Sequence, residues 1–286
     1  MAKLIYTNER GGSIELGQSA PFFVTDIDGF SNVDNIINSY QSVGQDGETE
    51  TNNNLASRHL VIQGQYYYLN KQDGRNKLIK VFNPKLKGTL RYINGGVIKE
   101  IKCRPEKTPV ISTNNRTSTV PYVINLYAPN PYWQDLTTKK TEIAIWQGSF
   151  EFPLEIIEEG IEMGYRELSL IVNVFNGGDV PCGMKIQFKA LATVDNPSLF
   201  SLNNQEYFKI NKAMEAGEII TVTTHFQNKK VELNKNGVVS NAFNWIDLAS
   251  SFLQLEVGDN LLKYDADEGI DNLEVSIWYT PQYLGV

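Results

Sequence analysis

Short runs in which apolar and polar residues alternate dominate the chain, and Gly, Asn, Asp and Pro separate these runs. Between Leu273 and Tyr279, Val275 and Ile277 share one face while Ser276 and Trp278 share the other, which is the period of two that a half-buried strand requires. The same alternation predicts strands in three further runs: Ser57 to Tyr68, Leu168 to Val174 and Ile219 to His225. The pattern therefore predicts an all-β protein.

Two turns with glycine predict hairpins. Asn94-Gly95 separates Leu90-Arg91-Tyr92 from Val97-Ile98-Lys99, and Asn-Gly supplies the positive φ angles of a tight primed turn. The run Asn234 to Gly237 predicts a second hairpin of the same kind.

Helical periodicity is scarce. From Arg75 to Phe82, three apolar residues share one face, and Pro84 ends the segment, so a short helix is expected here. Leu154 to Met163 fits either a short helix or an acidic loop, and Asn241 to Ser251 is a weak third helix candidate.

Two polar stretches, Thr49 to Asn54 and Ser112 to Ser118, are expected to be mobile loops. The composition also turns polar between Trp133 and Lys140, which predicts a linker there. Residues 1–134 hold 15 Lys and Arg against 11 Asp and Glu, a net charge of +4, whereas residues 135–286 hold 11 against 22, a net charge of −11. This change of sign supports two domains, 1–134 and 135–286.

A hydrophobic content of 41% with 21% charged residues fits a folded protein rather than a disordered one. The only two cysteines, Cys103 and Cys182, lie far apart, so a disulfide framework and a four-cysteine zinc site are excluded. No apolar segment of signal-peptide length opens the chain, and no window approaches a membrane span. We expect synthesis and folding in a cytoplasm, without membrane insertion.

Catalytic and metal-binding patterns are weak. His59 and His225 both lie in strand-like runs without a second ligand at metal-binding spacing. The acidic run from Asp265 to Asp271 has its glycine at position 5 instead of position 6 of a calcium loop, and position 12 is Ser276 instead of a carboxylate, so a solvated turn is favoured. No glycine-rich phosphate loop occurs. We therefore expect no catalytic residue, no metal and no cofactor.

The segment from Lys71 to Lys107 is basic, with 11 Lys and Arg against three acidic residues. Two interpretations explain this positive charge equally well. The segment is either a solvated helix-and-hairpin face or a surface that meets an acidic partner or passing DNA. Only Phe82 and Tyr92 supply aromatic rings there, which disfavours a dedicated nucleic-acid reader.

Four tryptophans could serve as platforms for sugar rings: Trp133, Trp146, Trp245 and Trp278. Packing in a core or between domains is favoured for each, because aromatic residues carry much of the buried area of β-proteins.

The order of short motifs along the chain is also informative. The second half contains, in sequence, Asn176 to Cys182, Met184 to Ala190, Asp195-Asn196-Pro197, Tyr207 to Ile210, Gly217 to Val222, Lys230 to Leu233, Ser251 to Leu255 and Gly258-Asp259-Asn260. The first half contains Gly44 to Glu48, Asn76 to Phe82, Gly88 to Tyr92, Asn94-Gly95-Gly96 and Leu126 to Trp133. In this order the chain resembles the distal tail (Dit) proteins of long-tailed bacteriophages, also called phage tail family proteins.

The resemblance implies a β-barrel-like first domain with one helix and a galectin-like β-sandwich as second domain. It leaves open whether the final strand, Glu274 to Tyr283, returns to the first domain. It also implies a non-catalytic virion protein of the tail tip, assembled in the host bacterial cytoplasm as a hexameric ring. That ring would join the tail tube to the adsorption apparatus.

The expected partners are the tail-tube protein, a tail-tip or tail-associated protein and the tape-measure protein, with DNA passing through the lumen. The first domains would form the ring, and we assign its contacts with neighbours or partners to six basic residues: Arg75, Lys77, Lys80, Lys85, Lys87 and Arg91. The alternative function is a carbohydrate-binding or cell-surface-binding tail module that uses one of the four tryptophans. The resemblance implies weak or absent sugar binding.

Overall fold

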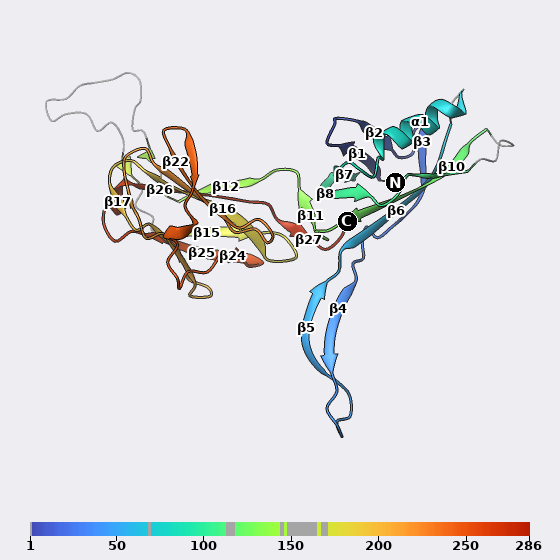
Figure 1. Ribbon diagram of the computed structural model, residues 1–286. Helices are drawn as coiled ribbons and strands as arrows, with labels where there is room; N and C mark the ends of the chain where they lie inside the picture. The colour runs from blue at the N-terminus through green and yellow to red at the C-terminus, as the bar shows by residue number, and fades with distance from the viewer. Residues whose placement is uncertain (1, 68–69, 113–117, 144–145, 148–164, 167–170) are drawn as a thin grey trace, which may run out of the picture. The chain divides into compact units, whose positions relative to one another are not determined.

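The computed structural model describes residues 2–67, 70–112, 118–143, 146–147, 165–166 and 171–286. The chain forms two compact units, one of residues 1–136 with 282–286 and the other of residues 137–281 (Figure 1). Strands make up nearly all regular structure, and one α-helix is present among the described residues. The all-β class is therefore confirmed. The ring-forming and galectin-like roles of the two parts stay predictions.

The first unit is built around a curved antiparallel sheet with strand order β2-β1-β7-β8-β10-β6-β3. Its strands are β1 (Lys3–Asn8), β2 (Ser13–Leu16), β3 (Phe22–Asp28), β6 (Arg58–Tyr66), β7 (Gly88–Asn94), β8 (Val97–Pro105) and β10 (Val120–Ala128), with short β9 (Val110–Ile111), β11 (Trp133–Asp135) and β27 (Gln282–Tyr283) at its sides. The outer strands β2 and β3 meet through a bridge between Gly17 and Phe23. This closure gives the unit its barrel-like form.

Alternation along the strands fills the interior of this sheet. Leu60 and Ile62 of β6 face inward with Leu90 of β7 and Leu126 of β10, and all four are fully buried. On β6, Gly64 lies opposite Tyr122, and a Cβ atom on this glycine would lie 2.5 Å from the tyrosine ring. The missing side chain therefore leaves room for the aromatic ring.

The helix α1 (Lys71–Val81) begins one turn earlier than the predicted start at Arg75. Asn70 caps it, because its side-chain oxygen accepts a hydrogen bond from the N–H of Gln72 at 3.1 Å. Gly74 is buried on the same face as Leu78, so packing against the sheet offsets the low helix propensity of glycine. Phe82, just after the helix, stacks on Tyr6 with ring centroids 4.5 Å apart.

Both predicted hairpins exist, but the first has a different turn. Asn94 pairs with Val97, so the two turn residues are Gly95 and Gly96, both with positive φ, rather than Asn94 and Gly95. Two glycines meet the requirement of a primed turn for positive φ at both central positions. The second turn has Asn236 and Gly237 with positive φ between β22 (Lys230–Lys235) and β23 (Val238–Asn241).

The expected mobile loop at Thr49 to Asn54 is wrong. These residues belong to β5 (Thr49–Leu55), which pairs with β4 (Asn35–Tyr40) in a two-stranded ribbon that we call the arm. Figure 1 shows the arm extending away from the sheet of its own unit. Most of the second expected loop, residues 113–117, lies outside the described residues.

The C-terminal segment returns to the first unit. The alternating strand β26 (Leu273–Tyr279) stays in the second unit, whereas β27 pairs with β11, Tyr283 lying opposite Trp133. Lys99 Nζ lies 2.6 Å from Asp135 Oδ1 and 3.2 Å from the centroid of the Tyr283 ring, and the Tyr283 hydroxyl donates to Asp135 at 3.0 Å. These contacts pin the end of the chain to β8 and β11.

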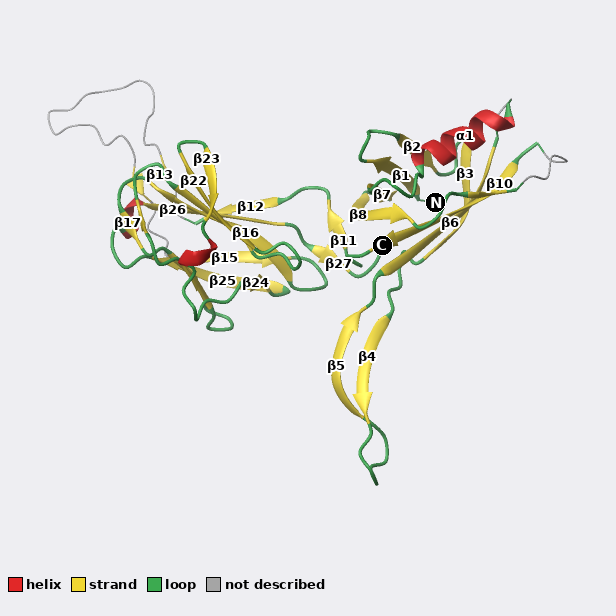
Figure 2. Cartoon of the chain, viewed as in Figure 1, coloured by secondary structure: helices red, strands yellow, loops and turns green. Residues whose placement is uncertain are grey.

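The second unit is a sandwich of two antiparallel sheets, drawn in yellow in Figure 2. The larger sheet has the order β12-β26-β16-β21-β22-β23, with β24 also paired to β16, and the smaller has the order β15-β25-β18-β19. The strands not yet bounded are β12 (Lys139–Glu142), β13 (Trp146–Gln147), β14 (Tyr165–Arg166), β15 (Ile171–Asn176), β16 (Cys182–Ala190), β17 (Val194–Asp195), β18 (Ser198–Ser201), β19 (Tyr207–Lys209), β20 (Ala213–Met214), β21 (Ile219–Thr223), β24 (Gln254–Leu255) and β25 (Gly258–Asp265). Two 3₁₀ turns, η1 (Phe243–Trp245) and η2 (Ile270–Asn272), complete the unit.

The core of the sandwich lies between these sheets. Ile186, Phe188 and Ile277 of the larger sheet and Leu199 and Tyr264 of the smaller are buried in one cluster. The helix candidate at residues 241–251 contains only the 3₁₀ turn η1, and the candidate at 154–163 lies outside the described residues.

Candidate assembly surfaces

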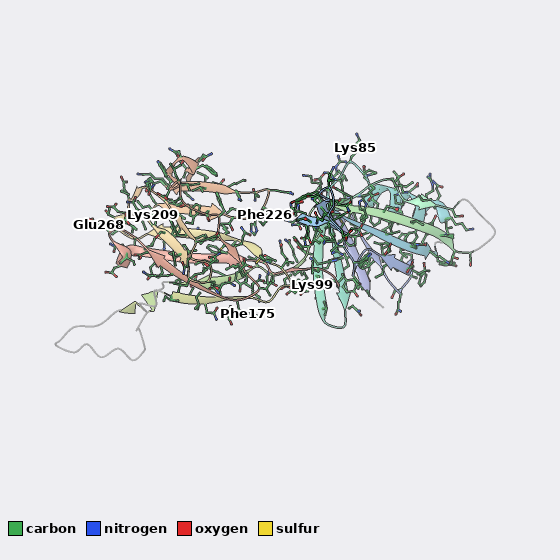
Figure 3. All side chains as sticks on the ribbon, turned by 90° about the horizontal axis from the view of Figure 1, so that it is seen from below. Lys85, Lys99, Phe175, Lys209, Phe226 and Glu268 are labelled. Carbon is green, nitrogen blue, oxygen red and sulfur yellow. The ribbon has the colours of Figure 1, made fainter. Side chains whose placement is uncertain are left out.

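The six predicted interface residues do not form one cluster. Arg75, Lys77 and Lys80 lie on α1, Lys85 (labelled in Figure 3) and Lys87 follow the helix, and Arg91 lies on β7. All are exposed except the half-buried Arg91. Four of them border three different hollows of the first unit. Lys77 lines a hollow of about 430 Å³, and Lys80 lines a hollow of about 480 Å³. Lys87 and Arg91 line a third hollow of about 630 Å³. Their role in an interface stays a prediction.

The largest of these hollows lies on the outer face of β1, β7 and β8. Ile5, Arg91 and Glu100 are register partners across the three strands, and the Arg91 guanidinium lies 3.7 Å from the Glu100 carboxylate. Lys102 and Arg104 of β8 line the same hollow. These two residues were not among the six predicted interface residues, although they alternate with buried residues of β8 and therefore share its outer face.

Arg58, which was not predicted as a functional residue, makes five side-chain hydrogen bonds in the first unit. It is only 2% exposed and donates hydrogen bonds to the carbonyl oxygens of Pro131 at 2.6 Å, Gly29 at 2.7 Å, Asn32 at 2.9 Å and Phe30 at 3.1 Å. A further bond reaches the carbonyl of Leu284. Burial lowers the pKa of this guanidinium. The alternation of β6 indicated that Arg58 is buried, since residue 58 shares the face of Leu60 and Ile62.

Arg58 also holds the root of the arm. The chain enters β4 after the carbonyls of residues 29–32, and Arg58 begins β6 just after β5. At the root, the Ala56 N–H donates to the Asp34 carbonyl at 2.8 Å, so the two ends of the arm are adjacent. Gly29 has φ +79, and a Cβ atom there would meet the His59 carbonyl, so this bend needs glycine.

The arm itself buries almost nothing. Apart from the half-buried Leu55, every residue of β4 and β5 is exposed, including Ile36, Ile37 and Tyr40 at 50%, 59% and 53%. Among the described residues, neither strand pairs with a third strand, so the outer backbone edge of each strand of the ribbon is unpaired. An isolated two-stranded ribbon is marginally stable in water. The arm is therefore a surface suited to contact with another chain.

The four tryptophans have different environments. Trp133 is fully buried in the core and donates from Nε1 to the Phe30 carbonyl at 3.1 Å, so the favoured core packing is confirmed for it and the alternative, a sugar platform, is ruled out. Trp245 is partly buried against the sandwich core, with Lys212 Nζ 5.2 Å from its ring centroid. Trp278 is half-buried on the outer face of the larger sheet. Trp146 begins β13, and its side chain lies outside the described residues.

A buried carboxylate joins two turns of the sandwich. Glu218 is 2% exposed and accepts hydrogen bonds from Lys212 Nζ at 2.6 Å and from the Glu215 N–H at 3.1 Å, while Lys235 Nζ lies 3.0 Å away. Burial alone raises the pKa of Glu218, but the bonds from Lys212, Glu215 and Lys235 outweigh it and hold the pKa at about 2. The carboxylate stays ionised and fixes the turn before β21.

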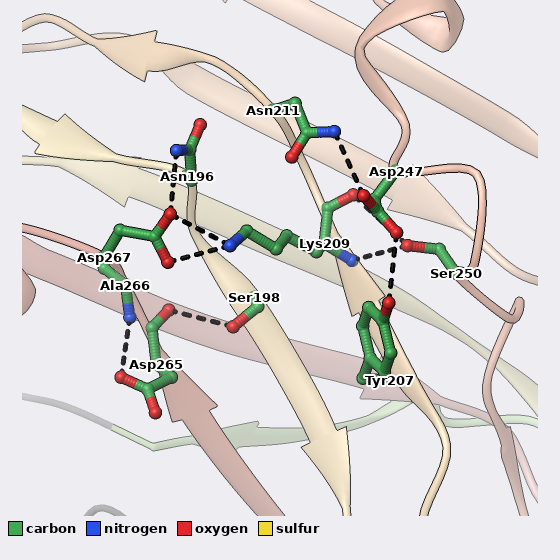
Figure 4. A network of polar contacts seen from close by, with 10 residues as sticks. All are labelled: Asn196, Ser198, Tyr207, Lys209, Asn211, Asp247, Ser250, Asp265, Ala266 and Asp267. Carbon is green, nitrogen blue, oxygen red and sulfur yellow. Dashed lines mark hydrogen bonds and ion pairs between the residues drawn. The ribbon is translucent and has the colours of Figure 1, made fainter.

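The acidic run near Asp265 takes part in a polar network on the smaller sheet (Figure 4). Both carboxylate oxygens of Asp267 accept bonds from Lys209 Nζ, at 2.8 and 2.9 Å, and Asn196 also donates to this carboxylate. Asp247 accepts a bond from Tyr207 at 3.1 Å on the other side. Among the described residues, no group of three His, Cys, Asp or Glu side chains is placed to hold a metal ion.

The histidines and cysteines are not grouped as a catalytic site requires. His59 lies on β6, as expected, and its ring contacts the Glu106 carboxylate. His225 lies beyond the end of β21, in a turn rather than in the expected strand. Cys103 and Cys182 are buried in different units, and burial raises the pKa of each thiol to about 12. Neither thiol is a ready nucleophile. None of the described helices has the length and apolar character that a membrane span requires.

Two protein-family models match successive parts of the chain. Residues 9–153 match the phage tail protein RIFT-related domain, and residues 177–283 match the siphovirus-type tail component, C-terminal domain. The first match covers half of the chain. The chain belongs to the siphovirus-type phage tail protein family. Membership of the distal tail group, which the motif order indicated, is confirmed, and the protein is a structural component of the phage tail.

Solved structures of other phage tail proteins share the fold of this family member. The crystal structure of SPP1 Dit, described as a paradigm of the hub adsorption apparatus in phages that infect Gram-positive bacteria, matches 98% of this chain and 99% of its own with a TM-score of 0.70 at 13% identity. Chains of the phage P2 baseplate in its activated conformation match over the full length of both chains, with Ca (TM-score 0.52, 11% identity) and with Sr (0.51, 12%). A search of curated protein sequences gave no match.

Proposed function

We propose that this phage tail protein is a non-catalytic hub that joins the tail tube to the adsorption apparatus of the tail tip. The observation that carries the proposal is the succession of two tail-family matches along one chain. The full-length likeness to a hub protein of another phage supports the same role.

The hub is a closed hexameric ring. A cyclic ring needs a head-to-tail interface, in which one surface of a subunit meets a different surface of its neighbour. The arm suits one side of such an interface, because its exposed Ile37 and Tyr40 and its unpaired edges gain partners only from another chain. We assign the other side to the exposed basic residues of α1, which are Arg75, Lys77 and Lys80.

The charge of the two units fits this arrangement. The ring is formed by the first units, and the acidic second units keep rings apart in solution, because like charges oppose association. The galectin-like character of the sandwich belongs to the same proposal. The partners are the tail-tube protein, a tail-tip or tail-associated protein and the tape-measure protein, and DNA passes through the lumen. Assembly takes place in the cytoplasm of the host bacterium.

Light scattering and negative-stain microscopy of the purified chain test the ring. Rings of six, single or paired, are expected. Since a ring can require a tail partner for closure, the decisive measurement is on virions: labelled antibody against this chain should decorate the tail tip. Decoration of virion heads would overturn the proposal.

A trimmed variant tests the contribution of the arm. Replacing residues 35–55 by a two-residue turn should abolish rings without unfolding the chain, because Asp34 and Ala56 are already adjacent. The matched control shortens only the tip, residues 42–47, and should retain the rings. Rings that survive the full deletion would show that the arm does not make the contact.

The non-catalytic part of the proposal is tested with purified cell walls. We expect no soluble peptidoglycan fragments after incubation with the chain. Fragment release that a single acid-to-amide substitution abolishes would show that the protein is an enzyme.

A further inference from the structure

One row of side chains crosses the outer face of the larger sheet of the sandwich. The register of five adjacent strands aligns Lys140 of β12, Trp278 of β26, Lys185 of β16, Thr223 of β21 and Lys230 of β22. The next positions along these strands, such as Ile277, Ile186 and Val222, are buried in the core, so the row itself faces outward. Four of these five strands, β12, β26, β16 and β22, can be found by their labels in Figure 2.

The three lysines of the row are evenly spaced. They lie on the first, third and fifth of five strands, and two strand spacings amount to about 10 Å. All three are exposed. Thr223 and the half-buried Trp278 occupy the strands between them. The row is therefore a line of cations at a regular interval, with an aromatic ring between the first two.

Two of the three lysines contact the Trp278 ring, and two of the three form no ion pair within the described part of the chain. Lys140 Nζ lies 5.4 Å and Lys185 Nζ 5.1 Å from the centroid of the Trp278 ring. Lys140 also pairs with Glu142, whereas Lys185 and Lys230 have no ion pair with any described residue. On the same outer face, Lys189 of β16 pairs with Glu274, and Glu232 lies two residues along β22 from Lys230, whereas on the smaller sheet Lys209 and Lys263 each pair with a carboxylate. In a half of the chain with a net charge of −11, Lys185 and Lys230 are thus two exposed cations of one row that are available to an anionic ligand.

We propose that this row binds a linear anionic polysaccharide whose negative charges are separated by sugar units. The lysines would meet its charges, and Trp278 would pack against the apolar face of a sugar between them. This inference does not depend on the ring, because it concerns a face of the sandwich and a ligand outside the tail.

Two other classes of ligand fit less well. DNA carries a phosphate about every 3.4 Å along each strand, far more densely than this row carries cations, and a single tryptophan offers no run of stacking platforms. The centre of a protein interface is depleted of charged residues, whereas here the centre of the row is lysine. Widely spaced charge with one aromatic ring favours a polysaccharide.

Binding of the full chain to hyaluronan, which has one carboxylate in every second sugar, tests the proposal at low salt. Neutral dextran, polyglutamate and oligodeoxythymidine are measured alongside it. We expect hyaluronan to bind and dextran not to bind. The double variant Lys185→Gln with Lys230→Gln should lose about tenfold in affinity and show a weaker dependence on salt concentration, since two ionic contacts are gone.

The matched control is Lys209→Gln with Lys263→Gln, which removes the same charge from the smaller sheet and should bind hyaluronan as the unchanged chain does. Trp278→Ala should weaken binding without changing the salt dependence, because its contact is not ionic. Circular dichroism and thermal melting confirm that each variant is folded. Equal binding by the two double variants, no binding of hyaluronan, or tighter binding of polyglutamate or the oligonucleotide would overturn the proposal.

Discussion

Arg58 in the first unit and Glu218 in the second are both 2% exposed, yet their charges are satisfied in different ways. Arg58 donates to backbone carbonyls of three segments, of which the C-terminal one lies 226 residues away in sequence. Glu218 accepts from two lysines and a backbone N–H, all within 17 residues. The first unit thus uses a buried ion to connect distant segments, and the second uses one to fix a local turn.

This difference has a consequence for stability. Removing a buried ion leaves its partners without hydrogen bonds, and the cost rises when those partners are themselves shielded from water. The carbonyls around Arg58 belong to the arm root, to Pro131 before β11 and to the C-terminal segment, whereas the lysines around Glu218 reach solvent. Four sets of substitutions test this comparison, and they follow in order of decreasing expected effect on the free energy of unfolding.

Replacing Arg58 by Met should have the largest effect. We expect a loss of about 3–5 kcal/mol in the free energy of unfolding, since several buried carbonyls lose their donor. Urea unfolding measures the loss, and hydrogen exchange should locate it at the arm root and at residues 282–286. Arg104→Met, at an exposed position of β8, is the control and should change stability little. Equal effects of the two substitutions would contradict the assigned role of Arg58.

Glu218→Gln should cost about 1–3 kcal/mol, because charge-assisted bonds to the lysines are weakened. The pKa of Glu218 is about 2 in the folded protein and near 4.5 in an unfolded chain. Its contribution to stability is therefore complete above pH 4.5 and is lost as the pH falls toward 2. Unfolding measured across this range should be less pH-dependent in the variant than in the exposed control Glu268→Gln.

The pair between Lys209 and Asp267 should matter less, because Asp267 is half exposed to water. Lys209→Met is expected to cost about 0.2–1 kcal/mol, and 1 M salt should remove most of this difference. Thermal melting at low and high salt measures both effects. A loss as large as that of Glu218→Gln would show that the network in Figure 4 acts as a unit rather than as separate surface bonds.

The smallest effect on folding is expected at the arm. Ile37→Ser and Tyr40→Ser should change the free energy of unfolding of the isolated chain by no more than about 0.5 kcal/mol, since both side chains are already exposed. A large loss in urea unfolding of the monomer would mean that the arm packs on its own chain.

Most strands were predictable because one buried face imposes a period of two on the sequence. The strand at Leu273 to Tyr279 was predicted with the bounds of β26, and Ile219 to His225 was predicted two residues longer than β21. The arm was not predictable in this way. Its β5 reads Thr-Glu-Thr-Asn-Asn-Asn-Leu, has no buried face and therefore carries no alternation.

The candidate surfaces were predictable only in part. A basic first half was evident, but the sequence could not show that Lys77, Lys80 and Arg91 border separate hollows. The lysine row was hidden for the same reason. Lys140, Lys185 and Lys230 are 45 residues apart at each step, and only strand order and register align them.

By itself, the sequence determined the all-β class, the helix before Pro84, the change of charge between the halves and the family, since each depends on local pattern or on the order of motifs. Tertiary structure alone decided which charges are buried, where the last strand lies and which side chains share a surface. Arg58 and β27 show why: their partners come from distant segments. The free energy of such contacts depends on the closed fold, and no local stretch of sequence records it.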